Sequence, residues 1–85
     1  MSAAVEYSNQ GIRINAVCPG WTATPMVGMS DAARAERESQ ALHETPQKRI
    51  AAPEEIAEAA LWLFSDAASF VTGVALPVDG GLLAQ

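Results

Sequence analysis

The length, composition and charge of the chain exclude several classes of protein. Its 85 residues leave room for at most one small domain. Ten acidic residues against five basic ones give a formal net charge of −5. That balance disfavours nucleic acid and polybasic membrane contacts as partners, although it leaves room for a local basic site.

Cysteine and histidine usage also limits the chemistry. The single cysteine, Cys18, permits no intramolecular disulfide and fits a reducing compartment. We interpret Cys18 as a small buried hydrophobe, because the one histidine, His43, lies in a polar segment. No apolar run reaches membrane-spanning length, and the first ten residues lack the features of a signal peptide. We therefore expect a cytoplasmic protein without a metal site.

The chain begins with a short helical pattern followed by a strand. Residues 2–9 are typical of the last part of a helix that ends at Gly11. A helix of about two turns is marginal by itself in water, so it is expected to belong to a larger unit. Residues 12–17 predict a strand that is buried on both faces, as in a parallel sheet. Pro19 and Gly20 are expected to end this strand.

The loop after this strand is a candidate ligand-binding segment. Thr22 and Thr24 place two hydroxyls and free backbone amides beyond the carboxyl end of the predicted strand. In open α/β sheets, ligands bind at that edge. The alternative is that Pro19 and Gly20 are an ordinary strand terminator with no ligand role.

A weakly apolar helix follows the loop. The pair Ser30-Asp31 is predicted to provide the N-cap of a helix that runs roughly through Glu44, and the alanine-rich, charged sequence of this helix predicts weak packing. Two interpretations remain open, a lid over a pocket or a plain solvated helix. In the first, the flexible apolar side chains of Met26, Val27 and Met29 line the pocket.

A second, more apolar helix is predicted from Pro53. Proline suits the first helical position, and the carboxylates of Glu54 and Glu55 complement the positive helix end. Adjacent helical residues point in different directions, which disfavours these two as a catalytic carboxylate pair. Apolar residues at helical spacing predict a broad buried stripe: Ile56, Ala57, Ala60, Leu61, Leu63 and Phe64.

The last predicted strand covers residues 74–79 and follows a short helical turn at 67–70. Pro77 inside this strand favours an edge position, since proline cannot donate to a neighbouring strand. The order strand, helix, strand predicts one crossover of a parallel α/β sheet. Two parallel strands cannot cover both of their own faces, so the sequence predicts part of a larger sheet.

Four stretches of the sequence resemble the short-chain dehydrogenase/reductase family, in the order in which that family has them. They are GIRINAVCPG with TPM (11–20 and 24–26), PQKR followed by PEEIA (46–49 and 53–57), SD with ASFVTG (65–66 and 68–73), and VDGG (78–81). The resemblance covers essentially the whole chain. It implies the C-terminal third of a doubly wound, Rossmann-like NAD(P)-binding domain, present here as residues 1–85.

The resemblance also implies a function and site residues. Family members transfer a hydride between NAD or NADP and a small-molecule carbonyl or alcohol, and act as homo-oligomers. By position, Pro19 and Gly20 would lie by the nicotinamide ring. The Thr22 backbone and the Thr24 hydroxyl would hold the carboxamide, which needs one donor and one acceptor. The segment from Met26 to Glu44 would be the substrate lid.

Other parts of the family pattern do not occur in these 85 residues. There is no glycine-rich phosphate loop, no catalytic serine, and no tyrosine with a lysine four residues later, because Tyr7 is followed there by Gly11. We therefore expect no catalytic residue and no activity from these residues alone. The alternative function is a non-enzymatic fragment or paralogue that pairs with a relative through an exposed sheet edge.

Overall fold

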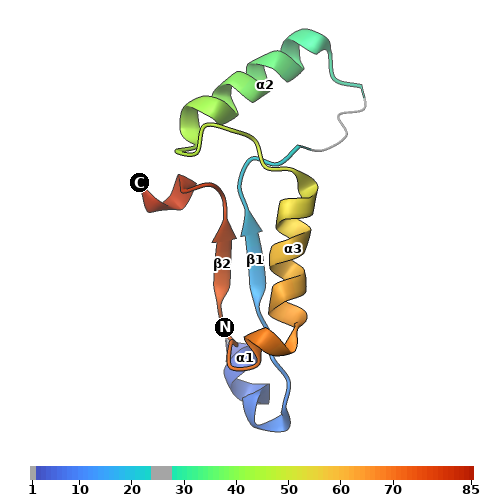
Figure 1. Cartoon of the computed structure of the whole chain (residues 1–85), viewed down its shortest axis with the longest axis vertical. Helices are drawn as coiled ribbons and strands as arrows, with labels where there is room; N and C mark the ends of the chain where they lie inside the picture. The colour runs from blue at the N-terminus through green and yellow to red at the C-terminus, as the bar shows by residue number, and fades with distance from the viewer. Residues whose placement is uncertain (1, 24–27) are drawn as a thin grey trace.

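Two parallel strands form the centre of the chain, with helices at their ends and on one side (Figure 1). The computed structural model describes residues 2–23 and 28–85. The elements, in chain order, are α1 (Ser2–Tyr7), the 3-10 turn η1 (Ser8–Gln10), β1 (Ala16–Pro19), α2 (Asp31–Glu44), α3 (Pro53–Phe64), η2 (Asp66–Ala68), β2 (Ala75–Val78) and η3 (Leu82–Ala84).

The helix boundaries follow the local signals in the sequence. The N-terminal helical segment ends at Gly11, which has φ 76 and the left-handed conformation that glycine adopts at little cost. Ser30 caps α2, since its hydroxyl oxygen accepts from the Ala33 amide at 3.1 Å. Pro53 is the first residue of α3. These three predictions are confirmed.

The first strand is shorter and later than predicted. The sequence pattern indicates residues 12–17, whereas β1 begins at Ala16 and includes Pro19 as its last residue. The reason is a contact that is distant in sequence. The Asn15 side chain donates to the Val71 carbonyl at 3.0 Å and accepts from the Val74 amide at 3.0 Å. The residues before β1 are therefore bound to the loop that precedes β2.

The backbone of β1 has one paired edge and one open edge. The Ala16 amide donates to the Val74 carbonyl at 2.9 Å, and the Gly20 amide donates to the Val78 carbonyl at 3.2 Å. In a parallel pair, alternate residues direct both backbone groups toward the same neighbour. Val17, between these positions, therefore directs its N–H and C=O away from β2.

The same alternation explains the proline in β2. Pro77 is in register with Cys18. Val74 and Val78 accept hydrogen bonds from the β1 side, so their backbone groups face β1. Pro77 directly precedes Val78, and neighbouring residues of a strand direct their backbone groups to opposite edges. Pro77 therefore faces the outer edge of β2. Its missing N–H removes no bond from the two-stranded ladder and makes the outer edge a poor template for another strand.

The apolar side of α3 is only partly covered. Leu63 is buried, but Leu61 is 60% exposed and Phe64 is 84% exposed. The predicted buried stripe is therefore wrong for these two residues, and also for Ala57, which is exposed. The physical reason is that α3 packs mainly against β1 and the short turn η2, and these two elements cannot cover a broad helical stripe. A cavity of about 250 Å³ remains between β1 and α3.

Candidate cofactor and substrate site

Gly20 lies at the carboxyl end of β1, against the end of β2. A Cβ atom on Gly20 would lie 2.8 Å from the Asp79 Cβ and 2.9 Å from the Asp79 Cα, a separation that real Cβ contacts do not reach. The Asp79 carboxylate is itself held, since it accepts from the Gly81 amide at 3.0 Å and the Leu83 amide at 3.1 Å. Close approach to β2 therefore requires glycine here, a reason that the sequence pattern does not show.

Thr22 presents its peptide groups on one side of the loop. Thr22 forms an isolated parallel bridge with Ala51. The Ala51 amide donates to the Trp21 carbonyl at 3.0 Å, and the Ala23 amide donates to the Ala51 carbonyl at 2.9 Å. Both bonds use the neighbours of Thr22, so the N–H and C=O of Thr22 itself point away from Ala51. The Thr22 hydroxyl donates to the Gly20 carbonyl at 3.1 Å.

These groups fit the carboxamide end of a nicotinamide. A carboxamide offers two N–H donors and one carbonyl acceptor, and Thr22 can match it with one N–H and one C=O. Thr24, Met26 and Val27 lie outside the described residues, so their predicted roles stay predictions. Met29 is half-buried at the start of the segment that leads into α2.

Trp21 connects the loop after β1 with α2. Its indole N–H donates to the Glu44 carboxylate at 2.9 Å, and the Arg37 guanidinium lies 5.2 Å from the centre of its ring. Residues 31–40 of α2 are all exposed, whereas Ala41 and Thr45 are buried. The helix is therefore attached at its C-terminal end. The sequence does not reveal the Trp21 contacts, because both partners are far along the chain.

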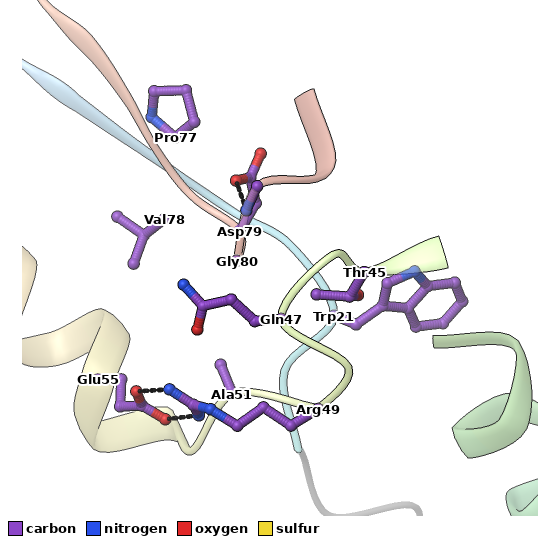
Figure 2. A pocket seen from close by; sticks show the side chains of 11 residues that line it. Trp21, Thr45, Gln47, Arg49, Ala51, Glu55, Pro77, Val78, Asp79 and Gly80 are labelled. Atoms are coloured by element: carbon purple, nitrogen blue, oxygen red, sulfur yellow. Dashed lines mark hydrogen bonds and ion pairs between the residues drawn. The ribbon is translucent and has the colours of Figure 1, made fainter. Parts of the chain in front are cut away.

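A cavity of about 350 Å³ lies on the β2 side of the same loop. Figure 2 shows it between the end of β2 and the segment that joins α2 to α3, with Trp21, Gln47 and Asp79 around it. The Arg49 guanidinium closes one side by a two-point contact with the Glu55 carboxylate, at 2.6 and 2.8 Å.

The Arg49 contact perturbs the pKa of Glu55. Hydrogen bonding from the Arg49 guanidinium, followed by that from the Ala52 amide, lowers the pKa of Glu55 from 4.5 to about 2. The Ala52 amide donates to the Glu55 carboxylate at 3.0 Å, so this carboxylate also caps the first turn of α3. The predicted role of Glu55 at the helix N-terminus is confirmed, with an arginine partner that the prediction did not include.

The described residues place no other reactive cluster near the loop. Tyr7 lies in α1, which is at the amino ends of both strands, away from Gly20 (Figure 1). Within residues 2–23 and 28–85, no three histidine, cysteine or acidic side chains gather in a way that could hold a metal ion. In the same part of the chain, no helix has the length and apolar character needed to cross a bilayer.

Comparison with known proteins identifies relatives along nearly the whole chain. A family model described as enoyl-(acyl carrier protein) reductase matches residues 1–83. The chain is 53% identical to an A-factor type γ-butyrolactone 1′-reductase of Streptomyces virginiae, covering 92% of this chain and 30% of that protein. It is 51% identical to cis-4-hydroxycyclohexanecarboxylate dehydrogenase of Sinomonas cyclohexanicum, covering 98% of this chain and 32% of the relative.

A solved structure has the same arrangement of elements. The ligand-free aldohexose dehydrogenase of Thermoplasma acidophilum matches with a TM-score of 0.85 and 39% identity, over 99% of this chain and 36% of that one. The chain thus spans about a third of the length of the relatives that it matches. The α/β arrangement with a parallel strand pair is that of the C-terminal part of their Rossmann-like domain. This chain belongs to the short-chain dehydrogenase/reductase family of oxidoreductases.

Proposed function

We propose that the chain forms the nicotinamide side of an NAD(P)-dependent oxidoreductase that acts on a small carbonyl or alcohol in the cytoplasm. Pro19, Gly20, Thr22 and Thr24 are its cofactor-binding residues. The segment that contains Met26, Val27 and Met29 belongs to the substrate lid. The observation that carries the proposal is the pair of outward peptide groups on Thr22, because they lie beyond the carboxyl end of a parallel strand.

The residues of this chain position the cofactor rather than react with it. The bound nicotinamide supplies or accepts the hydride. The Thr22 N–H and C=O bind its carboxamide. The close contact of Gly20 with Asp79 positions the loop relative to the end of β2. α2, attached through Trp21, covers the substrate and excludes water. The acid that protonates the substrate oxygen and the loop that binds the cofactor phosphates belong to the rest of the domain.

A two-part reconstitution tests the proposal. The 85-residue chain is expressed together with a complementing polypeptide, defined here as the part of the Sinomonas dehydrogenase that this chain does not match. We expect substrate-dependent reduction of NAD(P)+ by the pair and none by either part. If the relative's own C-terminal third restores activity while this chain binds without restoring it, the proposal is wrong.

Two variants at one position refine the test. Thr22→Pro removes the outward N–H, whereas Thr22→Ala removes only the hydroxyl that donates to Gly20. We expect Thr22→Pro to raise the KM for the cofactor about tenfold or more, as for loss of one well-formed hydrogen bond to a polar ligand. Thr22→Ala is expected to stay close to the wild type. Circular dichroism verifies that both pairs are folded.

The open edge of β1 supports a second candidate function. Val17 directs its backbone N–H and C=O away from β2, and the neighbouring Phe64 is 84% exposed. Free backbone groups beside an uncovered apolar surface are the features of a strand-addition site. We therefore also propose an interaction module that pairs with a full-length relative without catalysing a reaction. Native mass spectrometry separates the two functions, because only the second predicts a discrete, inactive complex with an intact relative.

A further inference from the structure

Most of the basic side chains of this acidic chain form hydrogen bonds or ion pairs within the chain. Lys48 donates to the His43 carbonyl at 3.3 Å. Arg49 forms the two-point contact with Glu55. Arg13 donates to main-chain carbonyls at and beyond the C-terminal end of α3, the nearest at 2.7 Å. These three cations are satisfied by the chain itself and offer little to a ligand.

Arg37 is in a different situation. Its guanidinium lies over the Trp21 ring, 5.2 Å from the centroid, and within residues 2–23 and 28–85 it has no hydrogen bond or ion pair. The Trp21 ring is fixed by the bond from its N–H to Glu44. A guanidinium on a fixed aromatic face keeps its N–H donors available in one plane, and that plane matches a carboxylate.

A small cavity of about 80 Å³ lies between the loop after β1 and α2. It is lined by Trp21, Thr22, Ala23, Arg34, Arg37, Glu38 and Ile50. The Arg37 guanidinium therefore lies in the lining of a cavity, in a chain that is acidic as a whole. Thr22, whose outward peptide groups are the proposed carboxamide ligands, belongs to the same lining.

We propose that Arg37 binds a carboxylate group of the substrate. This inference rests on the proposed function and deepens it by naming the substrate class, a carbonyl or alcohol that carries a carboxylate. A cavity of this size accepts the charged end of the substrate alone, so the reacting carbon lies outside it, toward the nicotinamide. A two-point contact with the Arg37 guanidinium fixes the direction of the substrate. One of the relatives, at 51% identity, is named for a hydroxycyclohexanecarboxylate.

Trp21 provides a direct readout that needs neither cofactor nor turnover. In a Trp62→Phe background, Trp21 is the only tryptophan, and its emission reports on the guanidinium above it. The chain bound to the complementing polypeptide, whose own tryptophans are replaced by phenylalanine, is titrated with cyclohexanecarboxylate and, separately, with the uncharged cyclohexanecarboxamide at constant ionic strength. We expect a saturable change with the carboxylate only.

Charge-matched variants locate the site. Arg37→Gln is expected to raise the Kd for the carboxylate about tenfold or more, because a hydrogen bond to a charged group is lost. Lys48→Gln removes the same charge at a committed residue and is expected to change the Kd by no more than about twofold, as for a screened surface charge. Arg37→Lys keeps the charge without the planar fork and should fall between them.

Three results would overturn the inference. An equal response to the carboxamide would mean apolar binding, and equal losses in Arg37→Gln and Lys48→Gln would mean a diffuse charge effect. Tighter binding of inorganic phosphate than of the carboxylate would assign the site to a cofactor phosphate. If the carboxylate does not bind, the reconstitution experiment can still support the proposed function. Carboxylate binding without activity in the reconstituted pair would contradict the proposed function alone.

Discussion

Two glycines in this chain are required for different physical reasons. Gly20 faces the Asp79 backbone so closely that a methyl group has no room. Glycine is therefore required at position 20 because the ends of β1 and β2 lie so close together. Gly11 differs, because it has φ 76 and a Cβ at this position would have no neighbour within 4 Å.

Replacing these two glycines separates close packing from backbone conformation. Gly20→Ala is expected to destabilise the chain bound to the complementing polypeptide by about 1–3 kcal/mol, the usual range for overpacking. Gly11→Ala should cost about 1–2 kcal/mol through left-handed strain alone. Urea unfolding measures both. A Gly20→Ala effect within about 0.5 kcal/mol of zero would show that the strand ends separate easily.

The Arg49–Glu55 contact predicts a pH dependence of known sign. Because the pKa of Glu55 is lowered from 4.5 to about 2, the folded state favours the ionised carboxylate. Its stabilising effect is fully present above pH 4.5 and is lost as the pH falls toward about 2. Carboxyl NMR titration should give this low pKa for Glu55, and Arg49→Gln should raise it. A titration of Glu55 near 4.5 in the wild type would contradict the contact.

At the scale of elements, local signals in the sequence predict the helices well. The hydroxyl of Ser30 and the ring of Pro53 act on the first turn of their own helices, so their effect is visible in a short window. The start of β1 was not predictable in this way. Asn15 bonds to residues 56 and 59 positions later, and no local pattern contains that information.

The attachment of α2 through Trp21 predicts a local effect on its dynamics. Trp21→Phe keeps a ring for Arg37 but removes the N–H that donates to Glu44. In the chain bound to the complementing polypeptide, we expect amide hydrogen exchange in α2 to become faster, by an amount that corresponds to about 0.5–1.5 kcal/mol. α3 should be unaffected. Trp62→Phe, on α3, is the matched control, and unchanged exchange in α2 of Trp21→Phe would mean that other contacts hold this helix.

Proline substitutions at the two outer edges of the strand pair are expected to have different effects on binding of the complementing polypeptide. Val17→Pro removes an N–H from the open edge of β1, and Ala75→Pro removes one from the outer edge of β2; neither breaks the ladder between them. We expect Val17→Pro to abolish binding of the complementing polypeptide and Ala75→Pro to preserve it. Native mass spectrometry of the two mixtures gives the comparison. Loss of binding in both, or in neither, would mean that the partner does not add at β1.

At the scale of the whole molecule, the chain is extended and thinly packed. Its radius of gyration is 16.0 Å, against about 12 Å for a compact domain of this length. Only four apolar residues are buried among those described, and three of them are alanines: Ala4, Ala41, Leu63 and Ala68. Such a core gives little apolar burial to offset the conformational entropy of the chain.

The family could be predicted from the sequence, whereas the exposure of the apolar side chains on α3 could not. Motifs such as the one ending at Gly20 occur in the family's order and need no knowledge of contacts. The burial of Leu61 and Phe64, by contrast, depends on what lies against α3. Their helical spacing predicts an apolar side, but in the described residues α3 packs mainly against β1 and η2, which leave that side partly uncovered. Thr24, Met26 and Val27 stay predictions of the sequence.

The central claim is that these residues complete a larger sheet, and differential scanning calorimetry tests it most directly. We expect the purified chain alone to show no sharp cooperative transition, because its core is too small. With the complementing polypeptide bound, we expect one cooperative transition that shifts further upward when NAD(P)H is added. A sharp, reversible transition of the monomeric chain alone, unchanged by that polypeptide, would contradict the account.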